Sequence, residues 1–274
     1  MTDQLRGVPH AGQLATDGLW ARLRGRTKKV VLLLADSVSG VLWPPVVVDG
    51  EETPAAWQRL FVRATSAGLV LRDTRGVTSD GATGLVAYLA RHLPWASHQR
   101  CVFHLWKSLA GEIATPVNAA VIGVDPEATK VAKQQAREKI VAALRAVLDA
   151  PTHLAAQHAF ERLQAPRWGN GLARLLDEHR DAALVHLLEY NQGLGRSSPE
   201  WLWRDFRLRL SHGRNHGSDV RLERAALLFA IYHNFEPAQE RSERTRHYRH
   251  PGLSPLAVAG VPPNGISYLD AVRV

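Results

Sequence analysis

Asp80 has neighbours that suggest a chemical role. A short β-prone run, Val77–Ser79, ends directly before this aspartate, and Gly81 follows it. This order predicts a carboxylate at the end of a strand, where the chain turns into a helix. Hard divalent cations such as Mg²⁺ prefer carboxylate oxygens as ligands, so Asp80 is the first candidate for a metal-binding residue.

The residues after Asp80 predict a helix and then a second β-prone piece. Four apolar side chains lie at the spacing of a one-faced helix: Leu85, Val86, Leu89 and Leu93. Pro94 stops that helix, and we expect a strand at Cys101–His104. The Cys-x-x-His pair in this strand could bind zinc, but a tetrahedral site needs four ligands. His92 and His98 are the neighbours that would complete it, and zinc binding stays open.

Composition limits the classes of protein that fit these candidates. The chain has 274 residues and 45% hydrophobic content, which is enough for a buried core. Its net charge is +8, with 28 Arg and 6 Lys. Arg donates paired hydrogen bonds to phosphate and so favours a nucleic-acid partner, although an Ala-, Arg- and Leu-rich chain is also typical of a high-GC genome. A single cysteine excludes an internal disulfide.

The apolar runs also bear on location. None approaches the length that spans a bilayer, and the N-terminal residues contain no apolar signal core. We therefore expect a cytoplasmic protein with no membrane partner.

The elements that would position Asp80 can be placed along the chain. Three consecutive strands are predicted at Gln13–Arg24, Lys28–Asp36 and Val41–Val48. Thr53 and Pro54 predict the N-cap and first residue of a helix. With the strand before Asp80, the helix after it and the strand near Cys101, the order is βββαβαβ. This is the order of an RNase H-like α/β core with a mixed sheet.

The segment from Val77 to Leu109 resembles the second-aspartate block of the bacterial IS256-like and eukaryotic Mutator-like DDE transposases. Those proteins carry a strand, Asp-Gly, a helix, a Pro step and then Gln-x-Cys-x-x-His. The matching residues here are Asp80, Gly81, Gly84, Leu85, Pro94, Gln99, Cys101 and His104. The resemblance covers roughly Leu14 to Gly260, including a basic stretch before Gly-x-Ser-Pro.

The resemblance implies a first catalytic aspartate on the first strand, followed by Gly, an aromatic residue and basic residues. The sequence ATDGLWARLRGR, residues 15–26, has this form, so Asp17 is the candidate. Asp36, in LADSVSG, is the alternative at the end of the second strand. Either aspartate could instead serve a turn, beside Gly18 or Ser37.

The resemblance also implies a glutamate on a helix after a Ser/Thr-rich loop, with an Arg about one helical turn later. RSSPEWLWRDFRLRL, residues 196–210, matches through Arg196, Ser197, Ser198, Glu200 and Arg204. Helical spacing puts Arg204 and Arg207 near the face that carries Glu200, so both are candidates for binding DNA phosphates. Arg196 of the matched motif is a third candidate. The structural alternative is that Glu200 is a first-turn acid favoured by the helix dipole.

Glu189 and Glu223 are less favoured alternatives for the third acid. The resemblance thus implies a DDE transposase in which Asp17, Asp80 and Glu200 hold two Mg²⁺ or Mn²⁺ ions. Its expected partners are double-stranded DNA, both element ends and target, and further copies of itself on that DNA. Its expected location is the nucleoid in the bacterial cytoplasm.

Two other functions share these residues. The first strand begins near residue 13, which leaves no room for the N-terminal end-recognition region that such transposases carry. The chain could therefore be a truncated or domesticated transposase remnant that acts as a DNA-binding or regulatory protein. An RNase H-like nuclease outside transposition would use the same acids.

The same resemblance implies a division of the chain. Residues 1–106 form the first part of the RNase H-like core, 107–192 an all-helical insertion before the last catalytic helix, 193–250 the completion of the core, and 251–274 a C-terminal tail. Cys101 and His104 are then a structural motif that packs and orients the insertion.

Overall fold

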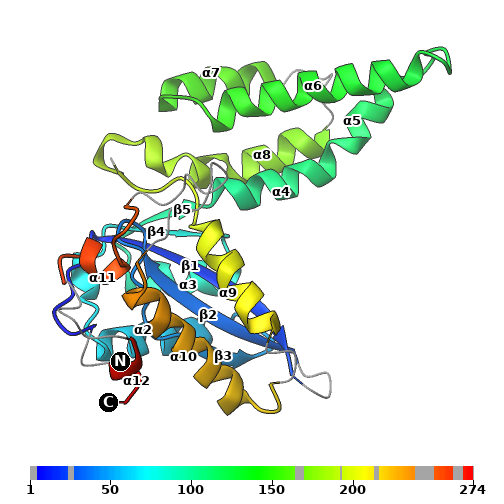
Figure 1. The fold of residues 1–274 in the computed structure, drawn as a ribbon. Helices are drawn as coiled ribbons and strands as arrows, with labels where there is room; N and C mark the ends of the chain where they lie inside the picture. Colours follow the sequence, from blue (N-terminus) through cyan, green and yellow to red (C-terminus); the bar gives the residue numbers. More distant parts are fainter. Residues whose placement is uncertain are drawn as a thin grey trace. The chain divides into compact units, whose positions relative to one another are not determined.

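The chain forms two compact units in the computed structural model (Figure 1), which describes residues 5–23, 28–163, 170–191, 193–212, 216–237, 250–261 and 268–273. The sheet unit is Met1–His98 with Ser198–Val274, and the helical unit is Gln99–Ser197. The basic residues expected at 24–27, and most of the basic stretch, at 238–249, lie outside the described residues. The domain boundaries given above stay predictions.

A five-stranded mixed sheet forms the centre of the sheet unit. Its strands are β1 (Gln13–Arg22), β2 (Lys28–Asp36), β3 (Val46–Asp49), β4 (Gly76–Ser79) and β5 (Ser97–Arg100), in the spatial order β3-β2-β1-β4-β5. β1, β2 and β3 pair antiparallel in succession, and β1 pairs parallel with β4. The prediction of an α/β protein with a mixed sheet is therefore confirmed.

Two helices cover one face of this sheet, named here the α2/α3 face. They are α2 (Pro54–Ser66) and α3 (Thr83–His92). Leu14 and Leu32 point to this face and lie in one buried cluster with Trp57 of α2 and Leu85 of α3. Burial of each such side chain contributes about 2 kcal/mol to stability, so this packing holds β1 firmly beneath both helices.

Two later helices cover the opposite face, the α9/α10 face. They are α9 (Glu200–His212) and α10 (Asp219–Phe235), coloured yellow and orange in Figure 1. Ala15 and Leu33 share a buried cluster with Trp203 and Phe206 of α9 and Phe229 of α10. Successive residues of β1 thus alternate between two cores, as the pleat of a strand requires.

The start of α2 follows the local sequence. Thr53 is extended, and its Oγ1 accepts a hydrogen bond from the backbone N–H of Ala56 at 3.2 Å. Pro54 is the first helical residue, where its missing N–H costs no hydrogen bond. The helix begins where the sequence predicts it.

The helical unit is built from five α-helices within the described residues. They are α4 (Val102–Glu112), α5 (Ala114–Ala119), α6 (Thr129–Leu148), α7 (His153–Leu163) and α8 (Asn170–Ala183), followed by the short 3₁₀ turns η3 (Val185–Leu187) and η4 (Glu189–Asn191). Their apolar faces meet in a core that includes Leu105, Leu144, Phe160 and Leu176. This unit has its own hydrophobic interior.

The strand expected at Cys101–His104 is wrong. β5 ends at Arg100, and Cys101 is the N-cap residue of α4. Val102 and Leu105 of this helix point into the helical core. The backbone N–H of Val102, which has no acceptor within the helix, donates to the carbonyl of Arg196 at 3.0 Å, a partner remote in sequence.

Three shorter elements complete the described chain. They are the 3₁₀ turn η1 (Leu71–Asp73) and the helices α11 (Pro255–Val258) and α12 (Tyr268–Arg273). Among the described helices, none combines the length and apolar character that crossing a bilayer requires.

Candidate functional site

Two of the predicted acidic residues belong to neighbouring segments of the sheet unit. β1, which carries Asp17, pairs parallel with β4, and the pairing extends to Ala15 beside Thr78. β4 ends at Ser79, one residue before Asp80, whereas β1 continues well beyond Ala15. That Asp17 and Asp80 act together stays a prediction.

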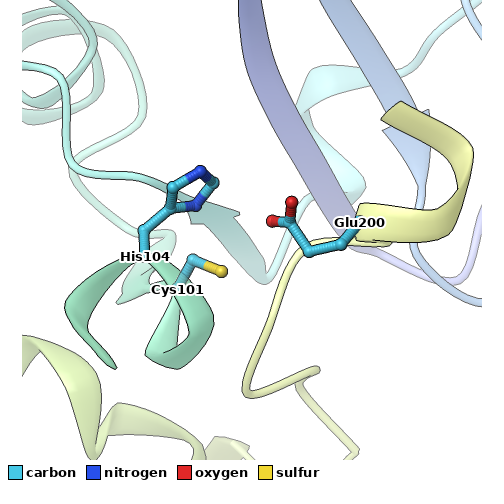
Figure 2. A group of neighbouring side chains, drawn as sticks. All are labelled: Cys101, His104 and Glu200. Atoms are coloured by element: carbon cyan, nitrogen blue, oxygen red, sulfur yellow. The ribbon is translucent and has the colours of Figure 1, made fainter. Parts of the chain in front are cut away.

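Asp17 points to the α9/α10 face. It pairs with Leu33 of β2 and alternates with the neighbouring residues of β1, so it shares its side with Ala15 and Leu19. Its side chain is buried. α9 packs against β1 on this face, and Glu200 is the first residue of α9, with its carboxylate drawn in Figure 2. Glu200 therefore begins the helix that covers the Asp17 side of the sheet.

Asp80 occupies the turn between β4 and α3. Its Oδ1 accepts a hydrogen bond from the backbone N–H of Ala82 at 3.0 Å, which fixes the carboxylate at the start of the helix. Gly81 has a φ of 85°, a conformation that favours glycine. Ser79 Oγ is 2.8 Å from Nε2 of His98, so the turn is also tied to β5. The Asp-Gly pair is thus explained by the geometry of the turn.

Asp36, the alternative first acid, serves as an acceptor for backbone groups. Its Oδ1 accepts hydrogen bonds from the N–H groups of Val38 and Ser39 and from the Ser39 hydroxyl, and its Oδ2 accepts from the N–H of Ala11 at 2.8 Å. The residue is 1% exposed. Oδ1 stabilises the turn after β2, and Oδ2 holds the segment before β1, so Asp36 has a structural role. The choice of Asp17 over Asp36 as the first acid stays a prediction.

Glu52 is an acidic residue of this region that the sequence analysis missed. It lies between β3 and α2, and its carboxylate fills the space that a Cβ on Gly18 would occupy. Its backbone carbonyl oxygen fills the space that a Cβ on Gly84 would occupy. Burial, and after it the charge of Asp80, raise the pKa of Glu52 to about 7. A glycine inside a strand marks such close approaches, so Gly18 was the available signal.

The residue types of the predicted acids suit a hard divalent cation. Asp17, Asp80 and Glu200, and with them Glu52, offer only carboxylate oxygens, which Mg²⁺ and Mn²⁺ prefer. Within the described part of the chain, the buried atoms Glu52 Oε2 and Thr16 Oγ1 have no hydrogen-bond partner. A cation would offset the effect of the Asp80 charge, which adds to that of burial in raising the pKa of Glu52.

The three arginines proposed to bind DNA lie in different settings. Arg204 and Arg207 are exposed on α9, on the helix side away from its buried residues. Arg196 belongs to the helical unit, where its guanidinium donates to the carbonyl of Leu148 at 3.1 Å and to Asp149 Oδ1 at 2.5 Å. Arg196 therefore holds the C-terminal end of α6. The DNA-binding role of all three stays a prediction.

The Gln-x-Cys-x-x-His residues form the N-terminal start of the helical unit. Figure 2 shows Cys101 and His104 on the first turn of α4. Gln99 is fully buried, and its amide donates to the carbonyl of Ala183 at 2.7 Å while its Oε1 accepts from the N–H of His186 at 2.8 Å. Gln99 therefore joins the first residues of the unit to the end of α8.

The zinc hypothesis for Cys101 and His104 stays a prediction. The two histidines that would complete such a site have other neighbours in the sheet unit. His98 contacts Ser79, as described above, and the ring of His92 stacks on Tyr88 with 4.7 Å between ring centroids.

Comparison with known proteins gives a family for the chain. The family model described as "Transposase, Mutator family" matches residues 35–197, and no curated protein matches. The matched region contains Asp80, Cys101 and His104, whereas Asp17 and Glu200 lie outside it. Because the match covers more than half of the chain, this protein belongs to the Mutator family of transposases, enzymes that cleave and transfer DNA.

Proposed function

We propose that this transposase performs metal-dependent DNA cleavage and strand transfer of the DDE type on an RNase H-like core, during transposition of an insertion sequence. Asp17, Asp80 and Glu200 are the proposed acids. The observation that carries the proposal is the parallel pairing of β1, which carries Asp17, with β4, which ends one residue before Asp80. The start of α9 on the Asp17 side of the sheet supports Glu200 as the third acid.

The fold assignment rests on the order and direction of the strands. Three antiparallel strands come first, and β4 then returns parallel beside β1 after α2. The helical unit follows β5 and precedes α9, as expected for an all-helical insertion before the last catalytic helix. Both features support an RNase H-like core with an insertion.

The protein residues would do two kinds of work. Asp17, Asp80 and Glu200 would hold two Mg²⁺ or Mn²⁺ ions, which when bound activate the attacking oxygen and stabilise the leaving oxygen in phosphoryl transfer. Arg204 and Arg207 would orient double-stranded DNA through its phosphates, since both are exposed one and two turns beyond Glu200. Joining two element ends requires at least two active sites, so we propose a homo-oligomer on DNA.

The test is the variant Asp80→Asn, which keeps the turn because the amide oxygen still accepts from Ala82. We expect strand cleavage in Mg²⁺ or Mn²⁺ to fall on the order of 1000-fold, because a bound metal contributes several kcal/mol and about 1.4 kcal/mol equals a factor of ten. DNA binding should be retained in a mobility-shift assay.

Asp73→Asn is the matched control. Asp73 lies in the same unit, and its side chain is more than half exposed. This variant should cleave at the wild-type rate. Full cleavage activity in Asp80→Asn would contradict the proposed mechanism.

A further inference from the structure

The loop before α2 places the acidic side chain of Glu52 against β1, the strand that carries Asp17. The carboxylate of Glu52 occupies the place of the missing side chain of Gly18, the next residue after Asp17. Gly84, in the first turn of α3, leaves room for the backbone of Glu52. Two glycines, one on each side, are thus required for Glu52 to lie where it does.

Glu52 approaches β1 from the face opposite to Asp17. Gly18 pairs with Leu32, which belongs to the core of the α2/α3 face, whereas Asp17 pairs with Leu33, which belongs to the core of the other face. The two carboxylates therefore flank neighbouring residues of β1 from opposite sides.

Asp80 belongs to the turn that leads into α3, and Glu52 lies against the first turn of that helix. Asp80 Oδ1 accepts from the N–H of Ala82, and the backbone carbonyl of Glu52 fills the space that a Cβ on Gly84 would occupy. Asp80 also acts electrostatically on Glu52, since its charge adds to the effect of burial in raising the pKa of Glu52. Like charges held together in this way favour a cation between them.

The setting of Glu52 differs from that of an acidic residue that only stabilises a helix N-terminus. An acid near a helix N-terminus is favoured by the helix dipole while it stays exposed to water. Glu51, the preceding residue, is exposed in this way. Glu52 is instead partly buried, with its Oε2 lacking a hydrogen-bond partner among the described residues.

Thr16 is a second, independent sign of a ligand on this side. It is 1% exposed, and it alternates with Asp17, so it shares the α2/α3 face with Gly18. In the described part of the chain its hydroxyl has no hydrogen-bond partner. Leaving a buried hydroxyl without a partner costs about 1–3 kcal/mol, which a bound ion or its water would remove.

We propose that Glu52 is a fourth acidic residue of the divalent-cation site and approaches Asp80 from the α2/α3 face, opposite to Asp17. This inference rests on the proposed function, because it takes Asp80 as a metal-binding residue. Glu52 contributes a carboxylate to cation binding, and Gly18 and Gly84 are glycines because they make room for it.

The test measures Mn²⁺ binding to the full chain by calorimetry, with the thermal unfolding temperature followed at increasing Mn²⁺. In Glu52→Gln the shape against Gly18 is kept and the charge is removed. We expect the affinity for Mn²⁺ to fall about 10-fold or more, the effect typical of residues that support a metal site. Without metal, this variant should be at least as stable as the wild type, because the repulsion by Asp80 is relieved.

Glu51→Gln is the matched control, since it removes the same charge from the adjacent, exposed position. It should bind Mn²⁺ like the wild type. Glu52→Asp, which keeps the charge but shortens the side chain, serves if the glutamine variant does not fold, and it should also weaken binding. Mn²⁺ affinity equal to that of Glu51→Gln, in whichever Glu52 variant folds, would overturn the inference.

Asp80→Asn separates this inference from the proposed function. If Asp80→Asn loses Mn²⁺ binding and the Glu52 variants keep it, only the role of Glu52 is wrong. If Asp80→Asn binds Mn²⁺ at wild-type affinity, the proposed function itself fails.

Discussion

The sheet unit and the helical unit use the residues of one contiguous motif for different purposes. In the sheet unit, Asp80 and Gly81 shape the turn between β4 and α3, and Asp80 is a proposed metal-binding acid. In the helical unit, Gln99 makes buried hydrogen bonds that close the unit on itself. A motif that reads as one signal in the sequence therefore divides between a turn of the sheet unit and the packing of the helical unit.

Two glycines that contact Glu52 also differ from a glycine on the surface of the helical unit. Gly18 and Gly84 of the sheet unit lie where an added Cβ would overlap Glu52, whereas an added Cβ on Gly111 of α4 would meet nothing within 4 Å. At positions 18 and 84, the close approach of the Glu52 carboxylate and backbone thus leaves no room for a side chain. At Gly111 there is room for a larger side chain, as is usual on the exposed surface of an amphipathic helix.

The largest effect on stability is expected for Gly84→Ala. The added Cβ would overlap the backbone carbonyl of Glu52, so α3 or the loop before α2 must shift. We expect a loss of about 3 kcal/mol in the free energy of unfolding, at the upper end of the effects of overpacking. Urea unfolding measures this loss.

Gly111→Ala is the control for that variant. In an exposed helical position, alanine should raise the free energy of unfolding by about 0.5–1 kcal/mol. Equal effects of the two substitutions would remove the distinction between the units.

An intermediate effect is expected for Gln99→Leu, which keeps the volume but removes the polar groups. The carbonyl of Ala183 and the N–H of His186 would each lose a buried partner. We expect the helical unit to lose about 2 kcal/mol, visible as faster hydrogen exchange in α8 and in the residues that follow it. Mn²⁺ binding should not change.

Gln134→Leu, at an exposed position of α6, is its control and should alter stability by less than about 0.5 kcal/mol. If Gln99→Leu weakened Mn²⁺ binding as much as Glu52→Gln does, the motif would not divide between the units in this way.

The smallest effect is expected for mild acidification of the sheet unit. His233 of α10 packs on Phe229, and its Nε2 lies 3.0 Å from the carbonyl oxygen of Gly40. Burial lowers the pKa of His233 to about 4. The unfolded chain therefore binds the proton more readily, and the stability due to neutral His233 is complete above about pH 6.5 and is lost as the pH falls toward 4.

We expect a loss of about 1–2 kcal/mol between pH 6.5 and pH 5, since one pKa unit equals 1.36 kcal/mol. Thermal unfolding of the wild type and of His233→Gln over this range measures it, because glutamine can still donate to Gly40 but does not titrate. The same pH slope in both proteins would assign the loss to other groups.

The sequence predicts those features that depend on neighbours along the chain. The start of α2 at Thr53 and Pro54 follows from capping chemistry within one turn. The proposal that Asp17 and Asp80 act together required the resemblance as well, because the two residues are far apart in sequence.

The features that sequence could not predict depend on remote contacts. The helix at Cys101 replaces the expected strand because Val102, Leu105 and Leu109 pack into a core made with later helices. Glu52 escaped notice because its setting is made by Gly18 and Gly84, each more than thirty residues away. Local propensity contains no information about such partners.

Hydrogen bonds join the first and the last residues of the helical unit. They bear on how much the length of this unit can change. The N–H of Val102 binds the carbonyl of Arg196, and the N–H of Phe103 binds Ser197 Oγ at 3.3 Å, so the two ends of the long segment between them meet. Closing a loop costs entropy that grows only slowly with its length, by about 0.6 kcal/mol for each doubling. Because its ends are joined, the segment could gain or lose whole helices at little entropic cost. The strand order of the sheet would stay the same.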